Sequence, residues 1–424
     1  MKRINWLGLL LMLLLPSVAM AQEGKGEFTV KGQLRPRAEY RHGALTPIGD
    51  GQKASSFISN RARVNVGYKY DFLSMGFAVQ DVSVWGERAQ IDGYPSTTGI
   101  NEAWAQLSNN GYFMKFGRQQ LTYDDDRILG TLDWHQAGRF HDALKLGYED
   151  VNHQVHLMLA YNQDKQGVNT GHYYSGGRQP YKAMQTAWYQ YKHNNNFRFS
   201  LLAMNLGFEA GTVGDGWAEG KTKFMQTLGG NVWYNVGGFS LFGSAYYQAG
   251  KSVADKSISA YLLAAKGQYK FTPNFSAALG IDYLSGQDDS DKVTRFDPLY
   301  GTHHKFYGTM DYFYVTPFGS GGLRDIYASL IFKPVPKLTL DLTYHHFASN
   351  QDIITGSGDT KRGLGSEVDL TVTYPIRPYV VLQGGYSMMF GTDAFHMIKG
   401  GSKDKTQLWG FLSLNVNPEI FSSK

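Results

Sequence analysis

Apolar and polar side chains alternate with a period of two along eighteen successive segments of the chain. Residues 338–345 and 367–374 are apolar at even positions and polar at odd positions, and residues 155–162 show a similar alternation. Because successive side chains of a strand point to opposite faces, each segment has one face suited to lipid and one suited to water. Eighteen such segments, joined by alternately short and long connections, favour a transmembrane antiparallel β-barrel over a soluble sandwich.

The predicted strands lie near 28–42, 56–70, 73–85, 100–108, 112–122, 139–149, 153–163, 182–193, 196–206, 222–235, 238–249, 257–271, 274–285, 323–332, 337–348, 364–374, 378–390 and 405–416. An even number of strands puts both termini on one side, with short turns in the periplasm and long loops outside. Residues 302–314 are therefore interpreted as ordered loop, since a strand there would make the number odd. Barrels of 16 to 18 strands enclose an aqueous channel, so the pattern predicts a pore.

The long connection at 286–322 is too long for an unstructured loop of a compact protein. Its residues from Phe306 to Phe313 are unusually apolar. We therefore expect this connection to fold over or into the pore mouth.

The N-terminal residues predict the destination of the chain. Lys2 and Arg3 precede an apolar stretch from Leu7 to Leu15 and the small-residue site Ala19-Met20-Ala21. This is the pattern of a secretory signal peptide, residues 1–21, and the stretch is shorter than the about 20 residues needed to span a membrane. Residues 22–424 are then one barrel domain, integral to the cell outer membrane.

The amino-acid composition argues against several kinds of anchor, metal site and partner. The chain has no cysteine, which excludes a lipoprotein anchor, disulfides and thiolate metal sites. The formal charge of +5 includes Lys2 and Arg3 of the predicted signal peptide and is too small to favour a nucleic-acid partner.

Charged side chains repeat on one parity of the first two predicted strands. They are Arg35, Arg37, Glu39 and Arg41 in the first strand and Arg61 and Arg63 in the second. An arginine facing lipid at the midplane costs about 2–4 kcal/mol, so this parity faces the lumen, where we expect the guanidinium groups to contact water. Charged rings set pore selectivity, and guanidinium groups bind carboxylates bidentately, which predicts a channel preferring anions with carboxylates. Alternatively, pairing with acids such as Glu39 and Glu102 merely neutralises the wall.

A longer motif lies between residues 117 and 143. It comprises Gly117-Arg118-Gln119-Gln120-Leu121, Asp125-Asp126-Arg127-Ile128-Leu129-Gly130, Asp133-Trp134 and Gly138-Arg139-Phe140-His141-Asp142-Ala143. This string resembles the alginate-export family of outer-membrane barrels. The two Arg-x-Arg pairs, Gln80-Asp81 with Val84-Trp85-Gly86, residues 302–313 and the last strand with Pro418 and Phe421 are also similar, so the resemblance covers essentially the whole mature chain. The C-terminal Lys424 departs from the aromatic residue on which many such barrels end.

The resemblance implies an 18-stranded, monomeric barrel whose electropositive constriction passes an acidic polyuronate such as alginate outward across the outer membrane. Ten pore-lining residues follow from it: Arg35, Arg37, Arg61, Arg63, Arg118, Arg127 and Arg139, with Glu39, Asp81 and Asp142 as acidic partners. Arg118 shares the parity of Met114 and Phe116. A bulge at Gly117 would turn it inward.

A general or anion-preferring porin for uptake of small acidic solutes is the alternative, since it would use the same fold and the same arginines. Export of a long polymer calls for periplasmic partners that feed the pore, whereas uptake does not. Oligomeric state also separates the two, because diffusion porins are more often trimers.

Other chemistry finds little support. The acidic stretches 124–126 and 288–291 lack EF-hand spacing and suit solvated loops or lipopolysaccharide-bridging surfaces. The adjacent pairs His303-His304 and His345-His346 are poor metal sites, since neighbours in a strand face opposite ways. No Gly-x-Ser-x-Gly elbow occurs, and Ser387 lies two predicted strands from His345 and His346. We therefore expect no enzyme activity, no metal and no cofactor.

Overall fold

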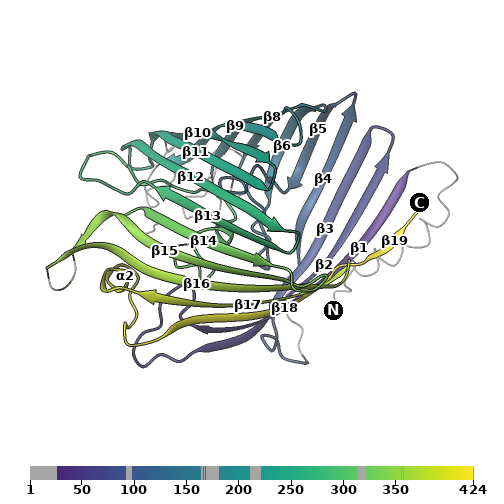
Figure 1. Ribbon diagram of the computed structural model, residues 1–424. Coiled ribbons are helices and arrows are strands. Elements are labelled where there is room, and N and C mark those ends of the chain that lie inside the picture. The colour runs from purple at the N-terminus through teal and green to yellow at the C-terminus, as the bar shows by residue number, and fades with distance from the viewer. Residues whose placement is uncertain are drawn as a thin grey trace.

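The computed structural model describes residues 26–91, 98–163, 166, 168, 181–210, 221–313, 321–354, 356 and 358–423. Its strands pair antiparallel, each with the next, and β1 pairs with both β2 and β18, which closes the sheet into an 18-strand barrel (Figure 1). A final short strand, β19, continues after β18 and pairs with the start of β1. Among the described strands β1 to β18, each pairs with a neighbour on both sides, which is how such barrels satisfy their backbone in lipid.

The strands are β1 Glu27–His42, β2 Ser55–Tyr70, β3 Leu73–Val84, β4 Gly99–Asn109, β5 Tyr112–Gln119, β6 His141–Glu149, β7 His153–Tyr161, β8 Ala183–Lys192, β9 Phe197–Ala210, β10 Lys221–Val236, β11 Phe239–Lys251, β12 Ser257–Thr272, β13 Phe275–Leu284, β14 Leu323–Phe332, β15 Thr339–Ile354, β16 Thr360–Arg377, β17 Val380–Gly391, β18 Gln407–Val416 and β19 Glu419–Ser422. The eighteen predicted strands are confirmed. The interpretation of 302–313 as ordered loop is confirmed as well, since it holds only the short helix η1 His303–Lys305. The helix α2 Asp393–Lys399, in the β17–β18 connection, was not predicted.

The alternation of side chains follows the two faces of the wall. In β16, Leu370 is exposed on the outer face, whereas Glu367 and Asp369 are buried on the inner face. The inner face stays polar because water and loop groups satisfy it, and the outer face stays apolar because it meets lipid. Among the helices of the described residues, none is long and apolar enough to cross a membrane.

Two long connections fold into the barrel. They are residues 120–140, between β5 and β6, and residues 285–313 of the connection between β13 and β14. They meet where Leu129 and Tyr300 form a parallel bridge, with backbone hydrogen bonds from Gly130 N to Tyr300 O and from Tyr300 N to Ile128 O.

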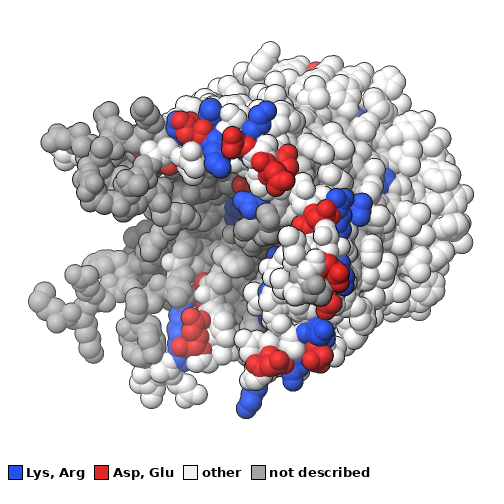
Figure 2. All heavy atoms as spheres, turned by 90° about the vertical axis from the view of Figure 1, so that its left-hand side faces the viewer, with Lys and Arg blue, Asp and Glu red and all other residues white. Residues whose placement is uncertain are grey.

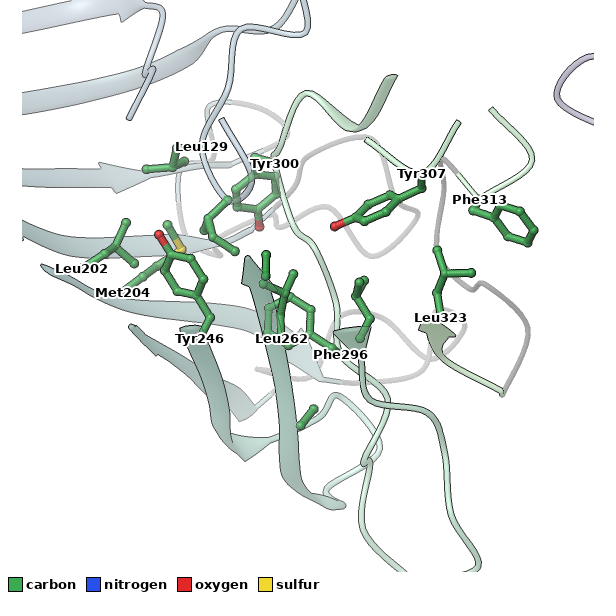
Figure 3. Packing of buried hydrophobic residues seen from close by; sticks show 14 of the residues in the cluster. Leu129, Leu202, Met204, Tyr246, Leu262, Phe296, Tyr300, Tyr307, Phe313 and Leu323 are labelled. Atoms are coloured by element: carbon green, nitrogen blue, oxygen red, sulfur yellow. The ribbon is translucent and has the colours of Figure 1, made fainter. Parts of the chain in front are cut away.

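Both connections pack on inward-facing side chains of the wall (Figure 3). The buried residues of this cluster include Leu129, Phe296, Tyr300, Tyr307 and Phe313 from the connections, and Leu202, Met204, Tyr246, Leu262 and Leu323 from the strands. The prediction that the 286–322 connection enters the pore mouth is confirmed for residues 286–313; residues 314–320 lie outside the described residues.

The face that carries the long connections is hollowed. Figure 2 shows Lys, Arg, Asp and Glu side chains gathered around this hollow. The lumen is therefore entered from a charged rim and narrowed by the inward-folded connections.

Candidate functional site

A five-residue stretch of the β5–β6 connection, residues 133–137, lies against the inner wall formed by β1 and β2. We call it the inner loop segment. It receives hydrogen bonds from Arg35, Arg37 and Arg61, which lie on the predicted inward parity. We call Arg35, Arg37, Arg61 and Arg63 the arginine row.

Arg61 and Arg35 hold the segment most directly. The Arg61 Nη1 group donates to Asp133 Oδ1 at 2.6 Å and its Nη2 group donates to His135 O at 2.8 Å. Arg35 Nη1 donates to Asp133 Oδ2 at 3.0 Å, and its Nε donates to Gln136 Oε1 at 3.1 Å. Asp133 thus bridges two neighbouring strands, as a carboxylate does when it accepts from two guanidinium forks.

Arg37 lies between a carboxylate and an aromatic ring. Its Nε donates to Glu39 Oε1 at 2.9 Å, and its Nη1 donates to Trp134 O at 2.7 Å. Its guanidinium carbon lies 4.0 Å from the centroid of the Trp134 ring, a cation–π geometry. On its other side the Trp134 ring stacks on His304 of the second connection, with centroids 4.1 Å apart.

Arg63 contacts the segment through a glutamine. Its Nε donates to Gln80 Oε1 at 2.9 Å, and Gln80 Nε2 donates to Ala137 O at 2.7 Å. Asn101 Nδ2 also donates to Ala137 O. The whole length of the inner loop segment is therefore hydrogen-bonded to the wall.

These contacts correct one expectation. The arginine row does not mainly contact water: Arg61 is 0% exposed and the Arg35 side chain is 11% exposed. The reason is tertiary, since a loop more than 70 residues away in sequence covers them. The Asp133 side chain is 53% exposed and lies on the open side of the cluster.

The electrostatics of the segment reflect the surrounding guanidinium groups. Burial would raise the pKa of Asp133, but Arg35 and Arg61 outweigh it and lower the pKa below its ordinary value. Burial and the arginines nearby lower the pKa of His135; they are Arg37, Arg61, Arg35 and Arg139. Asp133 is therefore ionised and His135 neutral at pH 7.

Two further candidates on the same connection have structural contacts. Arg127 is buried between Asp125 and Asp282, with N–O distances of 2.7 and 2.9 Å, and its guanidinium carbon lies 4.2 Å from the Phe306 ring centroid. Arg139 Nη1 donates to Gly301 O at 2.9 Å. Arg127 ties the first connection to the wall at β13, and Arg139 ties it to the second connection.

The remaining three candidates lie on the outer face near the long-loop rim. Arg118 and Asp142 are direct register partners and form two hydrogen bonds of 2.9 Å. Asp142 shares the parity of Leu144, outside the buried His141 and Ala143. The bulge expected at Gly117 is wrong, since β5 pairs with both neighbours there without a register shift.

The register between β2 and β3 shows that the Asp81 side chain also faces outward. It lies opposite Ala62, whereas its neighbour Gln80 lies opposite the inward-facing Arg63. Asp81 pairs with Arg88 at 3.0 Å. The structure thus brings Arg35, Arg37, Glu39, Arg61 and Arg63 together and leaves Arg118, Asp142 and Asp81 apart from them.

Sequence reasoning did not assign to the site the groups that complete the cluster. They are Asp133, Trp134, His135 and Gln136, together with Gln80. Asp133 and Trp134 belong to the motif between residues 117 and 143, so the motif itself was the available signal. Within the described ranges, no group of three or more His, Asp or Glu side chains could hold a metal ion.

A family model described as alginate export matches residues 27–410. A comparison with curated proteins found no match. Among solved structures, OccAB1 of Acinetobacter baumannii is similar with a TM-score of 0.62 and 14% identity, covering 93% of this chain and 97% of that chain. The outer membrane protein OpdK of Pseudomonas aeruginosa has a TM-score of 0.62 and 10% identity, covering 94% and 100%. A structure of OpdK with vanillate has a TM-score of 0.61 and 10% identity, covering 93% and 98%. At these identities the likeness concerns the fold.

Proposed function

Because the chain belongs to the alginate export family, we propose that it is an outer-membrane channel whose arginine-bearing constriction passes acidic saccharides, with an alginate-like polyuronate as the expected solute. The constriction consists of the arginine row and the inner loop segment. Export would add periplasmic partners that deliver the polymer, and we propose a monomeric channel.

The excess of positive charge at the constriction carries this proposal. The arginine row and Arg41 supply five guanidinium groups at or beside the inner loop segment. Within the described residues, Glu39 and Asp133 form ion pairs with this cluster, and Glu102 and Asp311 act on Arg63 and Arg37 from nearby, so four carboxylates oppose the five guanidinium groups. The positive charge exceeds the negative charge even though each arginine has a hydrogen-bond partner. In a narrow lumen with low-dielectric walls such an excess raises the local concentration of anions.

The arginine row acts mainly through this field, because the inner loop segment covers its side chains. The exposed carboxylate of Asp133 weakens the positive field of the arginine row. A weaker field suits a channel, since conduction needs binding that is weak enough to release the solute.

Uptake of small acidic solutes is the second candidate. The two inward-folded connections reduce the open lumen, which favours small solutes over a long polymer. OpdK, whose fold is similar, has been solved with vanillate. The same field would serve such a channel, so solute size separates the two candidates.

Planar-bilayer recordings of the purified protein test the proposal. Under a KCl gradient we expect a reversal potential that indicates anion preference, and a uronate oligomer should block the current more than a neutral oligosaccharide of equal length. Rising salt should reduce the preference, because the screening length is about 10 Å at 0.1 M and about 3 Å at 1 M.

The variant Arg63→Gln should lower the anion preference, since it removes one charge of the row and keeps hydrogen-bonding capacity. Arg362→Gln is the matched control, because Arg362 pairs with Asp352 in an exposed position. Cation selectivity in the wild-type channel would contradict the proposal. Block by uronate monomers and dimers, without any effect of longer oligomers, would favour uptake over export.

A further inference from the structure

A separate polar pocket of about 190 Å³ opens into the lumen between the start of the β5–β6 connection and strands β6 to β10. Its lining includes Lys145, Gln154, Trp188, Gln190, Arg198 and Trp233. Gln154 and the buried His156 alternate with the exposed Val155 and Leu157, so these pocket residues belong to the inner face of the wall.

The pocket lies toward the end of the barrel that carries the short turns. Gln154 is the second residue of β7, Arg198 is the second residue of β9, and Trp233 is three residues from the end of β10. The nearby connections are the short turns at 150–152, 193–196 and 237–238. Short turns face the periplasm in outer-membrane barrels, so the pocket is on the periplasmic side of the lumen.

Two cations of the pocket, Arg198 and Lys145, form no ion pair with a carboxylate of the described residues. The guanidinium carbon of Arg198 lies 4.2 Å from the centroid of the Trp233 ring, and Lys145 Nζ lies 5.1 Å from that of Phe113. Within the described part of the chain, neither side chain forms an ion pair or a side-chain hydrogen bond. Lys145 also stands directly opposite Lys115 in the β5–β6 register. Like charges in such positions are destabilising, and a bound anion would offset this.

The carboxylates near the pocket already have partners. Glu149 Oε1 lies 2.8 Å from His156 Nε2. Asp124 Oδ1 accepts a hydrogen bond from Trp188 Nε1 at 3.1 Å. Burial raises the pKa of Asp124, and its hydrogen bonds to Trp188 and Tyr246 oppose this shift. The carboxylate of Glu149 offsets part of the charge of Lys145 without forming an ion pair, so Arg198 supplies most of the positive charge that is left for a ligand.

The remaining lining groups suit a sugar ring. Trp233 offers aromatic surface on which an apolar ring face can pack. Gln190 Nε2 donates to Gln154 Oε1 at 3.2 Å, and the remaining amide groups of the two side chains can bind hydroxyl groups. Arg198 offers a fork that matches a carboxylate. The volume is below the about 300–1,000 Å³ of pockets for drug-sized ligands, which limits the occupant to about one ring.

We propose that this pocket is an entry subsite that binds one carboxylate-bearing sugar ring of the transported saccharide before it reaches the arginine-bearing constriction. The inference rests on the proposed function, because it gives the same class of solute a second contact in the lumen.

Calorimetric titration of the detergent-purified protein with a galacturonate trimer tests the subsite, with maltotriose as the neutral probe. We expect the wild type to bind the galacturonate trimer more tightly than maltotriose. Arg198→Gln and Lys145→Gln should each weaken binding of the acidic trimer about tenfold, which corresponds to about 1.4 kcal/mol. Arg362→Gln should bind like the wild type. Heat-modifiable migration on gels confirms that each variant is folded.

Bilayer recordings separate the subsite from the constriction. Uronate added on the short-turn side should block the Arg198→Gln channel less than the wild type, while the reversal potential keeps its anion preference. Wild-type-like binding in both pocket variants would overturn the subsite and leave the proposed function intact if the wild-type channel still prefers anions and is blocked by uronate. Absence of both uronate binding and anion preference in the wild type would overturn the proposed function together with the subsite.

Discussion

At the residue scale, Arg61 shows how tertiary contacts change the role of a side chain. Its parity in β2 predicted an inward position, and the structure agrees. Its guanidinium is 0% exposed, however, and donates to Asp133 and to backbone carbonyls of the inner loop segment. Arg61 therefore positions the loop that narrows the lumen, and its contact with a passing solute is indirect.

Replacing Arg61 with Gln should release the inner loop segment while the barrel stays folded. Hydrogen bonds to charged groups contribute about 1.5–3 kcal/mol each, and a shorter neutral side chain cannot reach both Asp133 and His135. We expect a larger and noisier single-channel conductance and faster proteolysis within residues 131–139. Arg362→Gln serves as the control. A variant with wild-type conductance and wild-type proteolysis would show that Arg61 does not hold the segment.

His135 adds a pH dependence to the same segment. Its Nδ1 accepts a hydrogen bond from Ala137 N at 3.2 Å, which requires the neutral ring. Because its pKa in the folded protein is below the ordinary value of about 6.5, its contribution is fully present above about pH 6.5 and is lost as the pH falls below it.

We therefore expect the conductance to be constant from pH 7 to 8 and to change at lower pH as the segment loosens. Bilayer recordings at several pH values measure this change. His135→Asn keeps an acceptor without a titratable ring and should reduce the pH effect. An unchanged pH profile in that variant would assign the effect to another group.

At the scale of elements, the β13–β14 connection depends on strand β16 for its inward course. Thr309 Oγ1 donates to Asp369 Oδ1 at 2.6 Å, and Met310 N donates to Glu367 Oε1 at 2.8 Å. Gly308, between these contacts and η1, has φ of +83°, and an added Cβ would lie 2.7 Å from the Glu367 carboxyl group. A glycine is required there by both backbone conformation and space.

Replacing residues 303–313 with a Gly-Ser linker of equal length should raise the conductance, because it removes packed side chains from the lumen. The barrel wall should persist, since its strands pair with one another independently of this stretch. Single-channel recording measures the change. The same replacement in the exposed β11–β12 connection, residues 252–256, is the control and should leave conductance unchanged.

Gly308→Ala is a smaller perturbation of the same connection. It should raise the conductance in the same direction by a smaller amount, because the strained backbone and the Glu367 contact displace the stretch without deleting it. Conductance equal to that of the wild type in both variants would show that the connection does not limit the current.

At the scale of the whole molecule, packing and charge together hold the two connections inside the lumen. The buried apolar cluster takes residues from strands between β6 and β18. Charge-assisted hydrogen bonds fix the connections at β1 and β2 through Asp133, at β13 through Arg127 and at β16 through Thr309.

The signal peptide predicted at residues 1–21 lies outside the described residues, and it is tested on the whole protein. We expect outer-membrane material to begin at Gln22. Intact-mass measurement of protein from purified outer membranes checks this, and its control is the same protein expressed from residue 22 after a start codon. A mass that retains residues 1–21 would contradict the predicted processing.

The sequence by itself determined the barrel. Alternation with a period of two is a local property, and each strand's own residues decide which face is buried. All eighteen strands were therefore found, with the largest error at β15, which was expected to end at 348 and ends at Ile354. Parity also placed Arg35, Arg37, Glu39, Arg61 and Arg63 on the inner face. The family resemblance also suggested Arg118, Asp142 and Asp81 as pore-lining residues, and these three face outward. A sequence motif gives the identity of a residue but does not say which face of the strand its side chain occupies.

Only the tertiary structure decided what fills the lumen. The contact of Arg61 with Asp133 joins residues 72 positions apart, and that of Thr309 with Asp369 joins residues 60 positions apart. Neither contact produces a periodic pattern in the sequence around its residues, so neither could be predicted from alternation. The pocket at Arg198 was missed for the same reason, since its lining combines five consecutive strands with residues 122–124 of the β5–β6 connection, which folds inward against them. Local alternation therefore specifies the wall, and long-range packing specifies the passage.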